Sequence, residues 1–289
     1  MRDTITSPRV LDMKRKVRRY RIRFSILLFI LFISIVGSLA YFSSYPRLVF
    51  NKINVNGTRI INPSDIESSL QEGMKGKYVY LFTRNNSLIY PKKTIYNNLL
   101  AKFPRIETLA IYRDNLNTLH VDITERAGAY LYCGELVPEM ASDIGENCYF
   151  VNNDGYVFDK APYFSGNLYF KYYMPLPDGS ANNPLSKQIL PPSSFHALAR
   201  FVDSITDLGF KPNYVVLDKD GNATLYLNHA PNATNTQIIF KNNENIDTML
   251  ANLSASMKKS EFANEINSKY SSLLYIDLRF NNKVIYKFQ

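Results

Sequence analysis

The sequence predicts an α+β protein whose larger part is carried on a single N-terminal transmembrane helix. Three observations lead to this fold class. Residues 24–42 form a run of nineteen without a charged side chain. Residues 47–126 show strand and helix patterns in the order β-α-α-β-β, which predicts helices on one face of a small sheet. Residues 127–289 alternate short strands and turn signals with amphipathic helical patterns, which predicts a mostly antiparallel β domain with covering helices.

The uncharged run has the length and composition of a membrane span. At 1.5 Å per residue, a helix over residues 24–42 covers about 28 Å, close to the thickness of the hydrocarbon core. Nine Lys or Arg and two Asp precede it in residues 1–23. This bias predicts a basic cytoplasmic tail (1–23), a transmembrane helix (24–43) and an extracytoplasmic remainder. A cleaved secretory signal is the alternative, because Ser38-Leu39-Ala40 resembles a cleavage site, but the run is longer than a usual signal core.

Most of the net positive charge of the chain lies in its N-terminal tail. The formal net charge is +9, and residues 1–23 contribute +7 of it, which leaves +2 for the rest. We therefore interpret the charge as a topology signal that also contacts anionic lipid, each cation near the surface contributing about 1 kcal/mol. This predicts the lipid bilayer as a partner and argues against nucleic acid.

Within 47–126 the expected elements follow from caps and periodicity. They are a strand over Phe50–Val55, a helix over Pro63–Gly73, an extended link over Tyr78–Phe82, a helix between Pro91 and Pro104, and strands over Ile106–Tyr112 and Thr118–Glu125.

Within 127–289 short strands are separated by turn residues. We expect strands over Tyr130–Cys133, Tyr149–Val151 and Tyr156–Phe158, a surface loop over Lys171–Pro192, a helix capped by Ser193 or Ser194 and closed by Gly209, strands over Tyr214–Leu217, Thr224–Leu227 and Thr236–Phe240, a helix from about Asn245, and final strands over Leu273–Leu278 and Lys283–Phe288.

The chain has two cysteines, Cys133 and Cys148, both in the predicted extracytoplasmic part. In an oxidising compartment they are expected to form one disulfide, which would contribute about 3 kcal/mol by closing a short loop. Two reduced thiols are the alternative. A metal site is not expected, since no histidines cluster with the two cysteines.

Residue patterns for catalysis are lacking. The histidines His120, His196 and His229 are scattered along the chain. Acid pairs, such as Asp122 with Glu125 and Asp203 with Asp207, are interpreted as solvated faces. We therefore predict no catalytic, metal-binding or cofactor-binding residues and no small-molecule substrate, and we expect a binding module rather than an enzyme.

One longer pattern resembles a known family. The run Pro104-x-Ile106-x-x-Leu109-x-Ile111-x-Arg113-x-x-Leu116-x-Thr118-Leu119-x-Val121-x-Ile123-x-Glu125-Arg126 resembles the end of a POTRA domain. Together with the upstream anchor it is similar to the FtsQ/DivIB family of bacterial cell-division proteins. The segment Tyr275–Phe280 also resembles a signature near the C-terminus of that family. Leu116 and Gly128 depart from the family pattern, at turns where Pro is usual.

The resemblance implies a non-enzymatic scaffold of the plasma membrane, located at the division septum, that recruits and bridges divisome proteins. In that family the C-terminal strands dock small single-pass coiled-coil partners of the FtsB and FtsL type. A last strand at a sheet edge can receive a partner strand through its free backbone groups. The sequence ends one residue after Phe288, so we expect no further strand on that edge.

By position, the expected partner-binding residues are Phe280, Asn282, Lys283 and Ile285. Lys283, Ile285 and Lys287 are expected to face one way, and Val284, Tyr286 and Phe288 the other. Three alternatives stay open: an ordinary terminal strand, a membrane-anchored cell-wall enzyme, and a POTRA module of an envelope assembly or secretion system, for which a long barrel sequence should follow.

Overall fold

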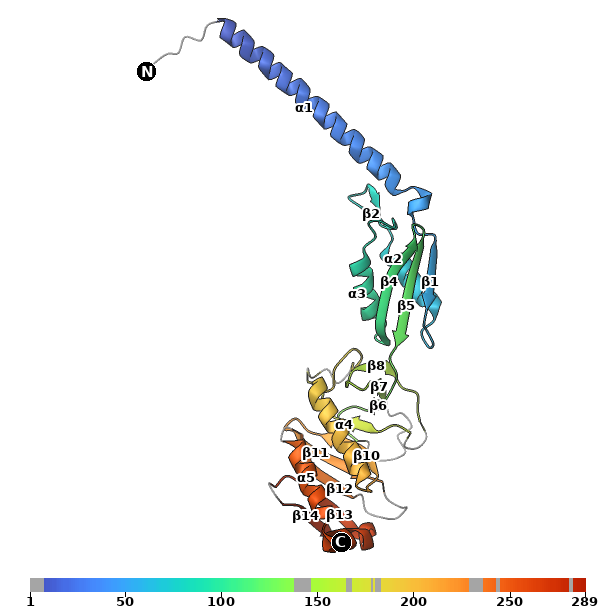
Figure 1. Cartoon of the computed structure of the whole chain (residues 1–289), viewed down its shortest axis with the longest axis vertical. Helices are drawn as coiled ribbons and strands as arrows, with labels where there is room; N and C mark the ends of the chain where they lie inside the picture. Colours follow the sequence, from blue (N-terminus) through green and yellow to red (C-terminus); the bar gives the residue numbers. More distant parts are fainter. Residues whose placement is uncertain are drawn as a thin grey trace, which may run out of the picture. The chain divides into compact units, whose positions relative to one another are not determined.

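The computed structural model describes residues 8–137, 147–164, 168–177, 179, 183–228, 236–242, 245–280 and 283–289 (Figure 1). It is a mixed α+β structure with one long apolar N-terminal helix and a large mixed sheet. The chain divides into two compact units. The first comprises Met1–Lys102 and Thr108–Glu125, and the second comprises Phe103–Glu107 and Arg126–Gln289.

The N-terminal helix α1 (Pro8–Ser43) contains 36 residues. Its part from Arg15 to Ser43 is long and apolar enough to span a membrane, and its apolar side chains are exposed. The helix begins inside the basic tail, for which the sequence patterns predict no secondary structure. A short 3₁₀ turn, Pro46–Leu48, follows α1.

The remainder of the first unit has strands and helices in the predicted order, with an additional small hairpin. Its elements are β1 (Lys52–Asn56), α2 (Pro63–Gly73), β2 (Lys77–Tyr78), β3 (Phe82–Thr83), α3 (Lys92–Lys102), β4 (Ile106–Asn115) and β5 (Thr118–Glu125). The three-stranded sheet has the order β1-β5-β4, and β1 runs parallel to β5 with Ile53 opposite Leu119. Such a parallel pairing needs a long crossover, which α2 and α3 provide.

The helix α2 forms because its cap and its apolar spacing agree. The side chain of Asn62 accepts a hydrogen bond from the Ser64 amide, and Pro63 is the first helical residue. The side chains that α2 and α3 bury recur at helical spacing: Ile66, Leu70, Ile95 and Leu99. Leu119, Val121 and Ile123 of β5 are buried as the alternation predicts.

The segment Tyr78–Phe82 differs from the expected extended link. It forms the turn of the β2–β3 hairpin, where the Leu81 amide donates to the Tyr78 carbonyl at 3.0 Å. Val79 and Tyr80 have φ angles of 49° and 60°. A positive φ is costly for a β-branched or bulky residue, so the sequence gives no sign of this turn.

Replacing Val79-Tyr80 with Asn-Gly is expected to raise the free energy of unfolding by about 1 kcal/mol, because Asn and Gly adopt a positive φ at lower cost. Chemical denaturation of the detergent-solubilised chain measures the change. The Ala-Ala replacement is the control, because it removes the same side chains while the turn keeps its φ angles. Equal stability of the two variants would contradict a strained turn.

In its described residues the second unit is built on a nine-stranded sheet in the order β14-β13-β12-β11-β10-β9-β6-β7-β8. Its strands are β6 (Tyr130–Tyr132), β7 (Tyr149–Val151), β8 (Val157–Lys160), β9 (Lys171–Tyr173), β10 (Pro212–Leu217), β11 (Asn222–Leu227), β12 (Gln237–Lys241), β13 (Leu273–Asp277) and β14 (Ile285–Phe288). Five neighbouring pairs are antiparallel, and three are parallel, namely β6–β9, β9–β10 and β12–β13. Helical crossovers explain two of the parallel pairs, since α4 joins β9 to β10, and α5 with α6 joins β12 to β13.

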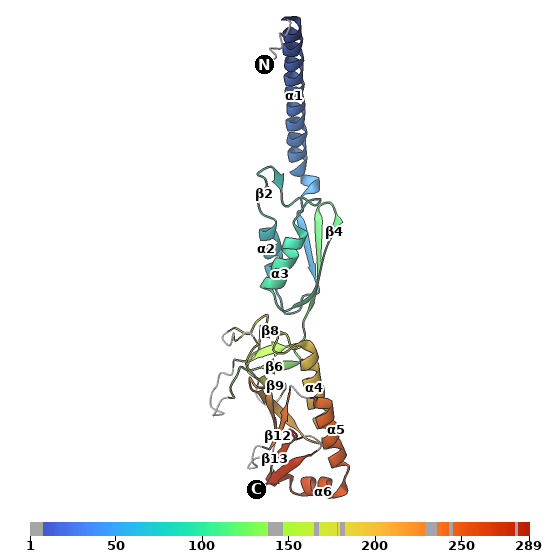
Figure 2. The same ribbon diagram turned by 90° about the vertical axis from the view of Figure 1, so that its left-hand side faces the viewer.

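The helices α4 (Pro192–Asp207), α5 (Ile246–Met257) and α6 (Ser260–Ser268) cover one face of this sheet (Figure 2). Between helices and sheet lies the main core, with fully buried side chains such as Phe195, Phe201 and Phe240. The rings of Phe201 and Phe240 lie 4.4 Å apart between centroids, which fixes α4 against β12.

Two sequence predictions in this unit are wrong. Lys171–Pro192 is not simply a surface loop, because its first residues form β9 in the interior of the sheet, and Tyr172, Tyr173 and Met174 are buried. These residues open a polar, proline-containing stretch, whose composition favours a loop. The helix α4 begins at Pro192, before the predicted serine cap, because Pro suits the first helical position.

Candidate partner-binding edge

The strand β14 lies at one edge of the large sheet (Figure 1). Within the described residues it pairs with β13 alone, in an antiparallel register that sets Ile276 opposite Tyr286 and Asp277 opposite Ile285. The outer side of an edge strand presents backbone N–H and C=O groups in a row. The edge can therefore accept a further strand.

The side chains of the last strand alternate as predicted. Val284, Tyr286 and Phe288 pack against the main core, whereas Ile285 is 39% exposed and Lys287 is exposed. One face of β14 thus packs against the main core. The other face offers an apolar and a cationic side chain.

Contacts with α6 hold β14 in place. The Tyr286 hydroxyl donates to Glu265 Oε2 at 2.8 Å, and Phe262 meets the Tyr286 ring edge-on, with 5.0 Å between centroids. This hydrogen bond raises the pKa of Tyr286, and together with the one from Lys269 it lowers the pKa of Glu265. Tyr286 is consequently a neutral donor to an ionised carboxylate, which is a strong hydrogen bond.

The link between β13 and β14 is organised by an ion pair. Asp277, at the end of β13, is only 5% exposed and accepts from the Arg279 backbone amide at 3.0 Å and from its Nη2 at 2.6 Å. Burial raises the pKa of Asp277, but the hydrogen bonds and charge of Arg279 outweigh it and leave this pKa below its usual value. The pair lies at the start of the link, directly before Phe280, whose side chain is exposed.

The residues predicted for partner binding occupy this edge and its link. Phe280 and Lys283 lie in the link and Ile285 begins β14, all three exposed, whereas Asn282 lies outside the described residues. The sequence interpretation missed the two supporting pairs, Asp277 with Arg279 and Glu265 with Tyr286. The first pair leaves a weak signal, opposite charges two positions apart at a strand end. The second joins distant elements and leaves none.

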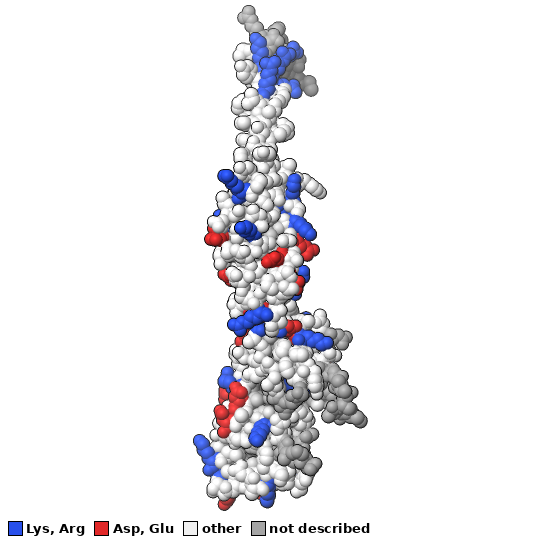
Figure 3. All heavy atoms as spheres, turned by 90° about the vertical axis from the view of Figure 1, so that its right-hand side faces the viewer, with Lys and Arg blue, Asp and Glu red and all other residues white. Residues whose placement is uncertain are grey.

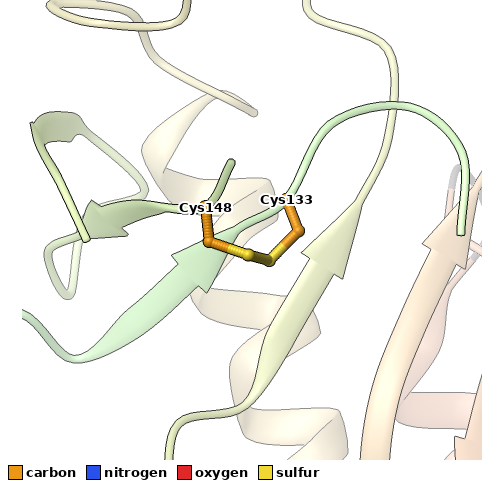
Figure 4. Close-up of a disulfide and its surroundings, with 2 residues drawn as sticks. All are labelled: Cys133 and Cys148. Atoms are coloured by element: carbon orange, nitrogen blue, oxygen red, sulfur yellow. A yellow bond between two sulfur atoms is a disulfide. The ribbon is translucent and has the colours of Figure 1, made fainter. Parts of the chain in front are cut away.

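A disulfide joins Cys133, which follows β6, to Cys148, which precedes β7 (Figure 4). Cys148 belongs to a small buried cluster with Leu131 and Ala161, apart from the main core. The disulfide therefore stabilises the end of the sheet formed by β6, β7 and β8. The strand β14 lies at the other edge of the same sheet.

The histidines contact single acids in separate places. His120 Nε2 lies 3.7 Å from Asp114, and its ring stacks on Tyr112. His196 Nε2 lies 3.0 Å from Asp154, and His229 lies outside the described residues. In the described part of the chain, no group of three His, Cys, Asp or Glu is placed to hold a metal ion.

Fold and edge together define an α+β protein with an N-terminal helix of membrane-spanning length and a sheet edge able to take another strand. No protein-family model matches the chain, and no curated protein matches it.

Proposed function

We propose that this protein is a membrane-anchored, non-enzymatic scaffold of bacterial cell division that binds other divisome proteins through β14. In this proposal residues 1–23 are cytoplasmic, residues 24–43 cross the plasma membrane once, and a POTRA domain (47–126) and a β domain (127–289) lie outside. The observation that carries it is the edge position of β14, with Ile285 and Lys287 facing away from the core. The FtsQ/DivIB resemblance supplies the biological setting.

Strand addition fits the chemistry of this edge. Main-chain hydrogen bonds would provide affinity, and alternate side chains would provide specificity. Ile285 and Phe280 favour an apolar side chain on the incoming segment, while Lys283 and Lys287 favour an acidic one. An extended segment of a small coiled-coil protein of the FtsB or FtsL type, apolar and acidic in alternation, suits this edge. Such binding should weaken as ionic strength rises.

The test is co-purification of the full chain with the FtsB-type and FtsL-type proteins of the same cell. Ile285→Pro distorts the edge strand, since the Ile285 amide faces β13, and Phe280→Ala removes the exposed ring, so each is expected to weaken binding about tenfold or more. Leu168→Ala is the matched control, because Leu168 is an exposed apolar residue of the same unit outside the edge. Circular dichroism and an intact Cys133–Cys148 disulfide verify folding of each variant.

Folded variants that bind as well as the parent chain would reject the edge as the docking site. A fluorescent fusion of the full chain tests the setting. It is expected to gather at mid-cell in dividing cells, and an even membrane signal would contradict the cell-division role. Release of the fusion from the membrane would instead indicate cleavage after Ala40.

A further inference from the structure

The turn of the β2–β3 hairpin exposes three consecutive apolar residues. Val79 and Tyr80 are 78% and 94% exposed, and Leu81 is also exposed. Leu88 and Ile89, shortly before α3, are exposed as well. We call these five residues the apolar tip. Single exposed apolar residues are common on soluble proteins, but a contiguous run on a strained turn indicates an interaction surface.

The last residue of α1 is hydrogen-bonded to residues close to both segments of the apolar tip. Ser43 is buried; its hydroxyl accepts from the Thr83 amide at 3.0 Å, and its carbonyl accepts from Asn86 Nδ2 at 2.9 Å. Both views of the ribbon place the hairpin beside the end of α1 (Figures 1 and 2). Tyr80 lies three residues from Thr83, so it stays within about 10 Å of that hydrogen bond.

The chain around the apolar tip is cationic. Residues 73–106 contain seven Lys or Arg and no Asp or Glu. Lys77 and Arg84 flank the hairpin turn, and Arg84 Cζ lies 5.3 Å from the centroid of the Tyr78 ring. In Figure 3 the uncharged stretch of α1 follows the cationic N-terminal tail, and further Lys and Arg side chains lie where that stretch ends toward the hairpin. Tyr beside apolar residues and cations is the composition of a membrane–water interface.

We infer that the apolar tip inserts into the outer interface of the bilayer that α1 crosses. Val79, Tyr80 and Leu81 enter the headgroup region, and Lys77 and Arg84 contact anionic headgroups. The inference rests on the membrane anchoring in the proposed function. Its consequence is a second membrane contact for the first unit, in addition to α1.

The chain contains no Trp, which permits a direct test. The full chain carrying Tyr80→Trp is reconstituted in vesicles of phosphatidylcholine and phosphatidylglycerol. Its emission maximum is expected to shift to the blue, and phosphatidylcholine brominated close to the headgroup is expected to quench it. Ile60→Trp is the matched control: Ile60 is 68% exposed, lies in the same unit beyond the other end of β1, and is expected to show neither effect.

A third variant, Phe32→Trp in the middle of α1, separates the inference from the anchoring on which it rests. Quenching of the Phe32→Trp variant by lipid brominated deep in the acyl chain, without quenching of the Tyr80→Trp variant, would overturn the inference and leave the anchor intact. Loss of quenching in both variants would overturn both. A blue shift of the Tyr80→Trp variant without quenching by brominated lipid would identify a protein contact, such as a second copy, and overturn insertion into lipid.

Discussion

Replacing Cys133 and Cys148 together with Ser is expected to lower the free energy of unfolding by about 3 kcal/mol. The bond joins residues fifteen positions apart, so its loss lets the unfolded chain gain the entropy of an open loop. The bond also joins two strand ends at the small cluster around Cys148, which lies apart from the main core. Chemical denaturation of the detergent-solubilised chain measures the difference.

Reductant provides an internal control for this prediction. Since the chain has only these two cysteines, the parent chain under reductant should unfold like the Cys133→Ser/Cys148→Ser variant, and the variant should not respond to reductant. Full alkylation of the native, unreduced parent chain would contradict the bond. Unchanged stability of the variant would contradict its role in the fold.

Much of the fold was predictable where the signals are local. The helix α2 has the predicted bounds, Pro63–Gly73, because an Asn cap and a Pro at the first position act within one turn. The strand β5 also has its predicted bounds, because Thr118–Glu125 alternates without interruption. The helix α5 begins after Asn245, whose side chain accepts from the Thr248 amide.

The parts that could not be predicted depend on distant residues. The strand β9 is short, and it is a strand only because β6 and β10 pair with it on either side. The helix α6 was missed, since Ser260–Ser268 has only nine residues and fully buries only Ile266. The edge position of β14 follows from the order of all nine strands. The sequence could therefore propose Phe280 and Ile285 as partner-binding residues but not the contacts that hold them there.

Replacing Arg279 with Leu is expected to cost about 3 kcal/mol of unfolding free energy near neutral pH, because it leaves the buried Asp277 carboxylate without its partner. The double variant Asp277→Asn/Arg279→Leu removes the charge as well and is expected to recover much of the loss, so a double-mutant cycle isolates the pair. Arg200→Leu is the matched control, since Arg200 is exposed on α4, and a change within about 0.5 kcal/mol is expected for it.

The loss of unfolding free energy in Arg279→Leu is expected to depend on pH. In the parent chain the folded pKa of Asp277 lies below the ordinary value of 3.8, so the stability from the pair is present above that value and is lost as pH falls through the folded pKa. In Arg279→Leu the burial of Asp277 is no longer outweighed, and its folded pKa rises above the unfolded one. The penalty of the variant should then shrink as pH falls from neutral through that raised pKa, because protonation removes the buried charge. A penalty independent of pH would show that Arg279 acts through packing.

The ion pair lies directly before Phe280, so Arg279→Leu is also expected to weaken partner binding. Co-purification measures this loss, and Arg200→Leu should keep the binding of the parent chain.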